Sequence, residues 1–111
     1  ELMDEIYELI WNRGRGEDDV IMLGDFQTNS ETLSSILGPS KLVPVLDAGV
    51  LTDTRLSKQT DNILVHSEAT PEFHGKAETF RFMRRFNLSL QESLAISDHL
   101  PVWAEFQLDE E

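Results

Sequence analysis

Carboxylate and imidazole side chains occur at three places where an apolar run meets a polar segment. Asp25 follows one apolar run after a single glycine, Asp61 precedes the next run, and the pair Asp98-His99 stands before a third. Histidine is the side chain best suited to proton transfer near neutral pH, and a carboxylate beside it can fix the orientation of its ring. A sheet-based fold can gather side chains from such boundaries on one rim. The sequence therefore predicts one site for acid–base chemistry.

Each of these residues also has an ordinary structural interpretation. Gly-Asp is a common turn dipeptide, so Asp25 could cap the segment that follows it, and Asp61 alone is equally unremarkable as a strand-flanking acid. His99 could be a hydrogen-bonded turn histidine with no chemical role. His66 and His74 have no acid pair nearby, and we interpret both as surface residues.

The composition excludes several other kinds of site. The 111 residues include no cysteine, which excludes a disulfide framework, a thiolate zinc site and a thiol nucleophile. No HExxH, Walker-type or GxGxxG motif occurs, so zinc hydrolase, nucleotide triphosphatase and dinucleotide functions have no support. With 9 basic against 21 acidic residues, the formal net charge is −12, which argues against a broad basic surface for nucleic acid. The acids form a solvated surface, or some of them gather around a divalent cation.

No segment predicts a membrane span or a secretion signal. The sequence has no run of about 18 apolar residues. Its first residues, Glu-Leu-Met-Asp-Glu, lack the basic start and apolar stretch of a signal peptide. Together with the absence of cysteine, this leads us to expect an intracellular protein, cytoplasmic or nuclear.

Three helices are expected. An amphipathic stripe predicts the first over residues 1–13. Ser30 is expected to cap the second, over residues 31–37, which Gly38 ends. The sequence Ser-Leu-Gln-Glu is a capping box and predicts the third helix over residues 90–95.

Strands are expected at residues 20–23, 62–66, 79–82 and 100–108. The first of these is apolar throughout, which predicts a strand buried on both faces. The least regular part is 41–60, where Pro44 limits any strand to an edge or a short piece, and 67–76 is expected to be a loop or a loose hairpin. The order of elements indicates a mixed α/β or α+β domain.

Taken together, three blocks of sequence resemble the endonuclease/exonuclease/phosphatase superfamily, which has the deoxyribonuclease I-like fold. The blocks are Asp-Val-Ile-Met-Leu-Gly-Asp-Phe at 19–26, Thr-Asp-Asn-Ile-Leu-Val at 60–65 and Ile-Ser-Asp-His-Leu-Pro-Val-Trp-Ala at 96–104. They match the last three motifs of the superfamily in the correct order. Residues 80–102 are also similar to the end of the deoxyribonuclease I sequence, so the resemblance extends over almost the whole chain.

The resemblance implies a role for each polar residue of the motifs. Asp25 matches the aspartate that orients or deprotonates the attacking water, and Asp98 matches an aspartate of the divalent metal site. His99 matches the histidine that contacts the scissile phosphate, and Asp61 matches the carboxylate that holds this histidine in its tautomer. Gln27 stands where the family usually has an asparagine that contacts water or phosphate. Its side chain is one methylene longer, which indicates either a weakened site or a variant one.

The implied activity is that of a Mg²⁺- or Mn²⁺-dependent phosphoesterase, with DNA favoured as the substrate. The basic residues Arg81, Arg84 and Arg85 could contact a phosphate backbone, or they could form a solvated face. Hydrolysis of small phosphoesters, of the inositol phosphate or sphingomyelin type, is the alternative within the same fold. A catalytically degenerate interaction domain is the alternative outside enzymes.

The resemblance also implies that residues 1–111 form only the C-terminal half of one domain. The superfamily domain is a four-layer α/β sandwich whose earlier half supplies the first asparagine, the metal-binding glutamate and a second histidine. One half alone would expose an apolar sheet face, at a cost of about 25 cal/mol for each Å². We therefore expect this segment to occur with the missing half, or as a dimer or swapped form when isolated.

Overall fold

The computed structural model describes residues 5, 21–38, 42–66 and 73–106, which form a mixed α/β fold with two antiparallel sheets and short helices. The fold class expected from the sequence is confirmed at this level. The helix expected over residues 1–13 and the acidic tail 109–111 lie outside the described residues, except for Glu5. In the described part of the chain, no helix has the length and apolar character needed to cross a membrane.

A three-stranded sheet carries the candidate site. Its central strand is β3 (Asp61–His66), and β1 (Met22–Asp25) and β2 (Leu42–Pro44) pair with it on either side, both antiparallel. β2 is a short edge strand, as expected, because a proline cannot donate a ladder hydrogen bond. The register places Asp25 directly opposite Asp61.

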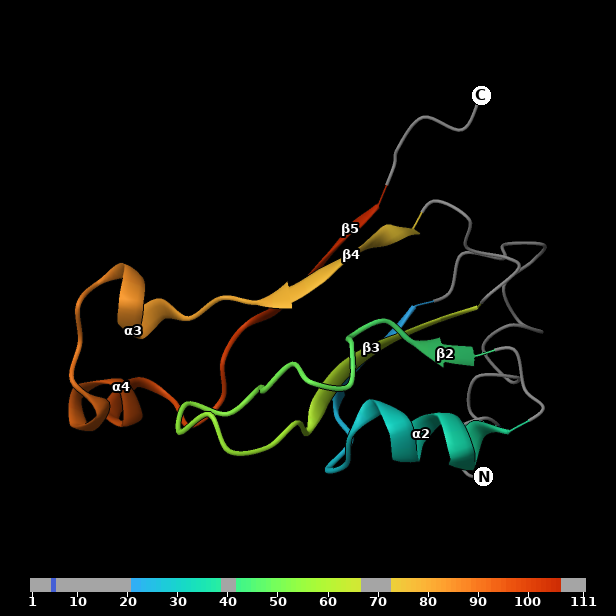
Figure 1. Cartoon of the computed structure of the whole chain (residues 1–111), viewed down its shortest axis with the longest axis horizontal. Helices are drawn as coiled ribbons and strands as arrows, with labels where there is room; N and C mark the ends of the chain where they lie inside the picture. Colours follow the sequence, from blue (N-terminus) through green and yellow to red (C-terminus); the bar gives the residue numbers. More distant parts are fainter. Residues whose placement is uncertain (1–4, 6–20, 39–41, 67–72, 107–111) are drawn as a thin grey trace.

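Helix α2 (Ser30–Leu37) covers one face of this sheet and ends at Gly38, as predicted, with a left-handed φ of 52°. In Figure 1, α2 lies below the sheet and strands β4 and β5 lie above it. Met22 and Phe26 pack partly buried against the core between α2 and the sheet. The fully enclosed side chains of this core are Leu33, Leu37, Leu42 and Leu64.

The residue that caps α2 is Asn29, not Ser30 as predicted. The Asn29 side chain accepts a hydrogen bond from the Thr32 N–H at 2.8 Å. Ser30 is instead the first helical residue and is buried, and its hydroxyl donates to the Leu46 carbonyl at 2.6 Å. Asparagine and serine are equally good caps, so adjacent Asn-Ser leaves the exact start of a helix open.

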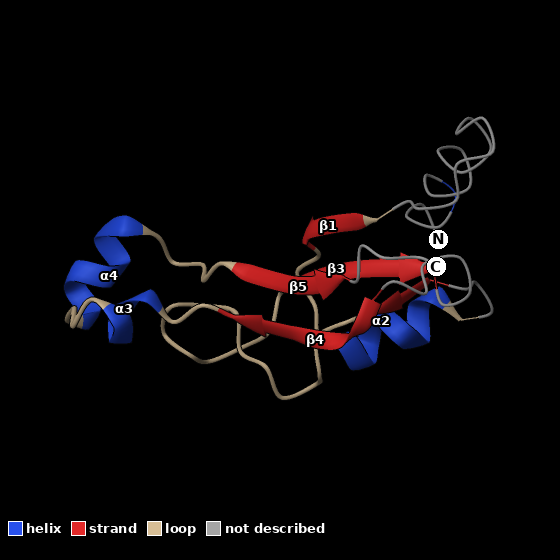
Figure 2. Cartoon of the chain, turned by 90° about the horizontal axis from the view of Figure 1, so that it is seen from above, coloured by secondary structure: helices blue, strands red, loops and turns tan. Residues whose placement is uncertain are grey.

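The second sheet pairs β4 (Phe73–Thr79) with β5 (Val102–Phe106), and two short helices connect them: α3 (Phe82–Arg85) and α4 (Leu90–Ile96). Figure 2 shows both helices at one end of this two-stranded ribbon, away from α2. The predicted capping box of α4 is confirmed, with both of its reciprocal hydrogen bonds present.

Two predictions for this region are wrong. Residues 79–82 are not a strand: β4 ends at Thr79, and a one-turn helix begins at Phe82, whose carbonyl accepts from the Phe86 N–H at 3.0 Å. Alternation over four residues is too short to distinguish a strand from one turn of helix. The loop or loose hairpin expected over 67–76 also ends earlier, because β4 begins at Phe73 with an irregular register before Lys76.

β1 is not buried on both faces, as its apolar sequence predicted. Met22 is half-buried towards α2, but Leu23 points to the other face and is 71% exposed, and Ile21 before it is also exposed. Asp25 is the last residue of the strand rather than part of the following loop. Among the described residues no element covers Leu23, so this face of the strand is apolar and open.

We expect the isolated 111-residue chain to self-associate, because burying Leu23 and Ile21 removes apolar surface from water. Size-exclusion chromatography at about 100 µM, coupled to light scattering, measures the mass. L23K should shift the protein towards the monomer, whereas I96K, which changes an equally exposed residue on α4, should not. A monodisperse, folded wild-type monomer would contradict this prediction.

Candidate active site

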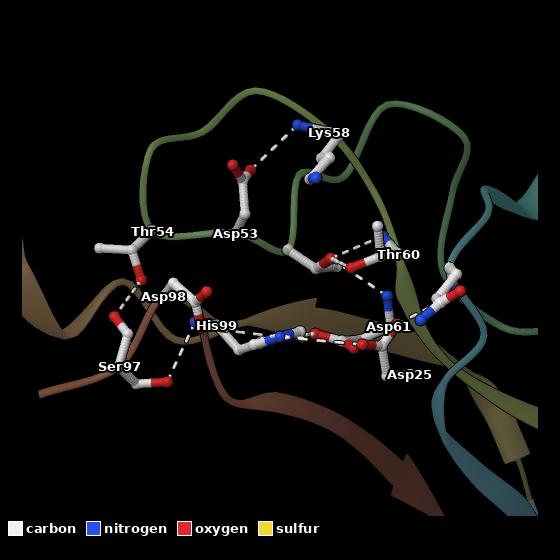
Figure 3. A network of polar contacts seen from close by, with 11 residues as sticks. Asp25, Asp53, Thr54, Lys58, Thr60, Asp61, Ser97, Asp98 and His99 are labelled. Carbon is white, nitrogen blue, oxygen red and sulfur yellow. Dashed lines mark hydrogen bonds and ion pairs between the residues drawn. The ribbon is translucent and has the colours of Figure 1, made fainter. Parts of the chain in front are cut away.

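Asp25 and Asp61 lie side by side on one face of the sheet because the β1–β3 register makes them direct cross-strand neighbours. Two like charges in this position destabilise a sheet. The imidazole of His99 reaches this pair from the turn before β5 (Figure 3). Its Nδ1 is 2.7 Å from Asp61 Oδ2, and its Nε2 is 3.8 Å from Asp25 Oδ2. A carboxylate can only accept, so Nδ1 carries the proton.

The turn that carries His99 is attached to the segment Thr52–Thr54. The Thr54 N–H donates to the Asp98 carbonyl at 3.0 Å, and the Thr54 hydroxyl donates to the Ser97 carbonyl at 2.7 Å. The Leu100 N–H donates to the Thr52 carbonyl at 2.8 Å, and Asp53 forms a β-bridge with His99. These bonds hold the backbone of the histidine on both sides.

Thr52 also fixes Asp61. Its side chain is fully buried, and its hydroxyl oxygen accepts from the N–H groups of Thr60 and Asp61, at 2.8 Å and 3.2 Å. One buried threonine therefore contacts the backbone of the acid through its side chain and the turn of the histidine through its carbonyl. The short distance between Asp61 and His99 depends on this arrangement.

The segment after β1 is folded back over the start of β3. The N–H groups of Phe26 and Gln27 both donate to the Thr60 carbonyl, at 2.8 Å and 3.1 Å. The Gln27 N–H also lies 3.0 Å from Asp25 Oδ1. Gln27 has a left-handed backbone, with φ of 60°. Asparagine adopts this conformation more readily than glutamine. Glutamine is therefore less suited to this backbone than the asparagine that the resemblance implies at this position.

The electrostatics of the site favour the charged form of His99. The hydrogen bond to Asp61 raises the pKa of His99 above its ordinary value, and this outweighs partial burial, which lowers it. The charges of Asp61, Asp98 and Asp25 raise the pKa further. Asp98 Oδ1 lies 3.7 Å from His99 Nε2, on a side chain that is 81% exposed.

A cavity of about 520 Å³ opens above these side chains. It brings together four of the residues predicted from the sequence, Asp25, Gln27, Asp98 and His99, while Asp61 lies behind the imidazole. The remaining lining belongs to the loop between Asp53 and Thr60. The basic residues Arg81, Arg84 and Arg85 do not line it, because they lie in and just before α3, at one end of the molecule (Figure 1).

The sequence did not reveal the loop residues Asp53, Arg55, Ser57 and Lys58. They lie in the part of the chain without periodicity, where only the Thr-Asp-Thr sequence, typical of turns, marks a special position. Burial disfavours the charge of Asp53, but hydrogen bonds from Ser57 and Lys58 outweigh it and hold the pKa of this carboxyl below its ordinary value. Asp53 is thus an ionised anchor of the loop.

The donor atoms present fit a divalent cation. Ligand atoms of Asp25, Asp61 and His99 lie within 4.8 Å of one another. Asp61 is already engaged by the imidazole, so the carboxylates of Asp25 and Asp98 are the oxygen donors that remain. Carboxylate oxygens suit Mg²⁺ and Mn²⁺, and Asp98, the metal-binding residue predicted from the sequence, lies outside the three-residue cluster but lines the same cavity.

Comparison with known proteins gives relatives over most of the chain. No family model matches the sequence. The chain is 34% identical over 97 residues to deoxyribonuclease-1-like 1 of Rattus norvegicus, which covers 79% of this chain and 31% of the relative. It is 33% identical over 110 residues to the Mus musculus protein of the same name, with 91% and 35% covered, and 32% identical over 99 residues to the Bos taurus protein, with 81% and 31% covered. The chain spans about a third of the length of these relatives.

The matches confirm the resemblance that the three motifs indicate: the chain is related to the endonuclease/exonuclease/phosphatase superfamily. Over most of its length the chain is similar to deoxyribonuclease-1-like 1 proteins, of which it covers about a third. The relatives support a family of nucleases and phosphoesterases, hence of hydrolases.

We expect D61N to lower the pKa of His99, because it removes the strongest interaction that favours the imidazolium. NMR titration of the ring in metal-free buffer measures this value, and D47N, which changes an exposed acid outside the cavity lining, is the control. Since folding raises the pKa of His99, its stabilising effect is complete below about pH 6.5 and is lost as the pH rises through the raised value. If the pKa of His99 is the same in D61N as in wild type, the hydrogen bond between Asp61 and His99 is contradicted.

Proposed function

We propose that this chain is the C-terminal half of a metal-dependent phosphodiesterase domain that cleaves DNA. The observation that carries the proposal is the contact between Asp61 and His99 beside Asp25, at the mouth of a cavity. The name of the relatives, deoxyribonuclease-1-like 1, supports DNA as the substrate. The proposed domain has the four-layer α/β sandwich of the superfamily, and the missing half covers the open face of β1.

His99 binds the scissile phosphate in this mechanism. Its Nδ1 is held by Asp61, which leaves Nε2 directed towards Asp25 and Asp98 in the cavity. The raised pKa of His99 favours the protonated ring, whose Nε2–H donates a hydrogen bond to a phosphate oxygen. Asp61 acts through the imidazole, by fixing its orientation and stabilising its charge, as carboxylates do for other catalytic histidines.

Asp25 accepts a hydrogen bond from the attacking water and takes its proton as the water oxygen bonds to phosphorus. The ester P–O bond opposite the water breaks in the same step, and the leaving oxygen takes the proton that His99 Nε2 donates. Its Oδ1 already lies near the Gln27 N–H, while Oδ2 faces the imidazole. Gln27 lines the same cavity, and its amide contacts the water or a phosphate oxygen in this mechanism. Its longer side chain on a left-handed backbone supports a slower enzyme rather than an inactive one, because the acid–histidine pair is intact.

Asp98 and Asp25 would hold the Mg²⁺ or Mn²⁺ ion. A bound divalent cation supplies positive charge against the phosphate and lowers the barrier to attack by water. Asp98 suits this role because its side chain is largely exposed at the cavity and no other described residue donates a hydrogen bond to its carboxylate.

We expect H99A and D25N each to reduce Mg²⁺-dependent cleavage of DNA by the full-length gene product by about 10²–10⁴-fold, the usual effect of losing a general acid or base. Cleavage of a supercoiled plasmid measures the rate. D47N, outside the cavity lining, is the matched control and should retain wild-type activity.

The 111 residues alone should show no turnover, because the resemblance places the metal-binding glutamate in the missing half. Activity that survives both substitutions would overturn the site assignment. Hydrolysis of inositol phosphates or sphingomyelin but not of DNA would instead favour small phosphoesters as substrates. An inactive full-length protein that still folds would indicate the degenerate interaction domain.

A further inference from the structure

Two cationic side chains of the cavity, Arg55 and Lys58, have no part in the mechanism above. We propose that they form a second phosphate subsite, which binds a phosphate next to the scissile one on a nucleic acid strand. This inference rests on the proposed function and restricts its substrate class. The substrate must carry at least two phosphates in a chain, rather than a single phosphoester group.

Arg55 and Lys58 share the cavity with the residues of the chemistry. Both line the space of about 520 Å³ that Asp25 and His99 also line. Ligand sites typically have a volume of about 300–1,000 Å³, so this cavity has room for more than one phosphate group. A phosphate bound at His99 and a second one at the cations would belong to one ligand.

The charges of Arg55 and Lys58 are free for a ligand. Both side chains are exposed, and in the described part of the chain neither makes an ion pair. Two other described cations do have partners. Lys76 Nζ lies 3.7 Å from Glu105, and the guanidinium of Arg85 lies 5.6 Å from the centre of the Phe86 ring.

The backbone that carries the two cations is held in place. The Asp53 carboxylate accepts from the Ser57 N–H at 2.7 Å, from the Ser57 hydroxyl and from the Lys58 N–H at 3.0 Å. The Leu56 N–H donates to the Asp53 carbonyl at 2.9 Å, and Leu56 has a left-handed φ of 56°. A turn closed by four hydrogen bonds loses little entropy when a ligand binds.

The same turn is attached to the catalytic histidine. Asp53 forms a β-bridge with His99, so the base of the loop and the imidazole are neighbours through the backbone. The spacing between the scissile phosphate and the two cations is therefore set by the fold. Phosphates along a nucleic acid strand also have a regular spacing, which two long cationic side chains on a fixed backbone can match.

The charge of the site explains why such a subsite is needed. The other ionised groups of the cavity lining include the acids Asp25, Asp53 and Asp98, and the whole chain carries a net charge of −12. These charges repel a polyanion. Arginine binds phosphate through two parallel hydrogen bonds and lysine binds it as a point charge, so the pair offsets this repulsion where the strand enters.

The experiment compares two substrates in the full-length gene product. One is a single-stranded DNA oligonucleotide, and the other is bis(4-nitrophenyl) phosphate, which has one phosphate. R55Q and K58Q should each raise KM for the oligonucleotide about tenfold at low salt. Each should also reduce the slope of log KM against log salt by about 0.7, the value for one lost phosphate contact on a single strand. The loss in kcat/KM on the small diester should be at least about fivefold smaller.

K76Q is the matched control and should behave as wild type on both substrates. The subsite is overturned if the two variants lose activity equally on both substrates, if KM for the oligonucleotide does not change, or if R84Q raises this KM as much as R55Q does. The last result would indicate that the oligonucleotide binds to Arg81, Arg84 and Arg85 instead.

Binding measured without turnover separates this proposal from the proposed function. Fluorescence anisotropy of a labelled oligonucleotide in EDTA reports affinity when no cleavage is possible. If wild type cleaves neither substrate but R55Q and K58Q alone weaken binding, the function fails and the subsite stands. If wild type cleaves both substrates and the variants bind as wild type does, the subsite fails and the function stands.

Discussion

The register of two strands brings two carboxylates together, and the structure of the site follows from how that repulsion is relieved. Asp25 and Asp61 are direct neighbours across the β1–β3 ladder. A cationic group beside them converts an unfavourable pair into a favourable one. His99 supplies this group, with one ring nitrogen on Asp61 and the other directed towards Asp25. The same contact that stabilises the pair also orients the imidazole for chemistry.

This contact depends on a residue that has no chemistry of its own. Thr52 is buried, and it binds the start of β3 through its hydroxyl and the turn before β5 through its carbonyl. The irregular segment between β2 and β3 therefore joins the two sheets at the level of the site. The polar side chains that this segment buries, such as Thr52, replace ladder hydrogen bonds that an irregular backbone lacks. Gln59 does so as well, with its amide on the carbonyls of Asp47 and Val50.

The sequence could predict the residues of the site but not the segment that holds them. Asp25, Asp61 and His99 stand at strand boundaries that hydrophobic runs reveal, so their convergence follows from a sheet. Thr52 lies where no periodic pattern exists, and a single sequence does not show which threonine will be buried. The exposure of Leu23 could not be predicted from the sequence of β1 either. An apolar strand has the same sequence whether the element that packs on it lies within these 111 residues or outside them.

The central claim is that Asp61 fixes His99 with its proton on Nδ1 and leaves Nε2 for the phosphate. Nitrogen-15 NMR of the histidine rings in the full-length gene product, in metal-free buffer above the pKa of His99, identifies the tautomer directly. We predict that neutral His99 carries its proton on Nδ1, with Nε2 unprotonated. A neutral His99 that carries its proton on Nε2, or that exchanges equally between the two tautomers, would contradict the account.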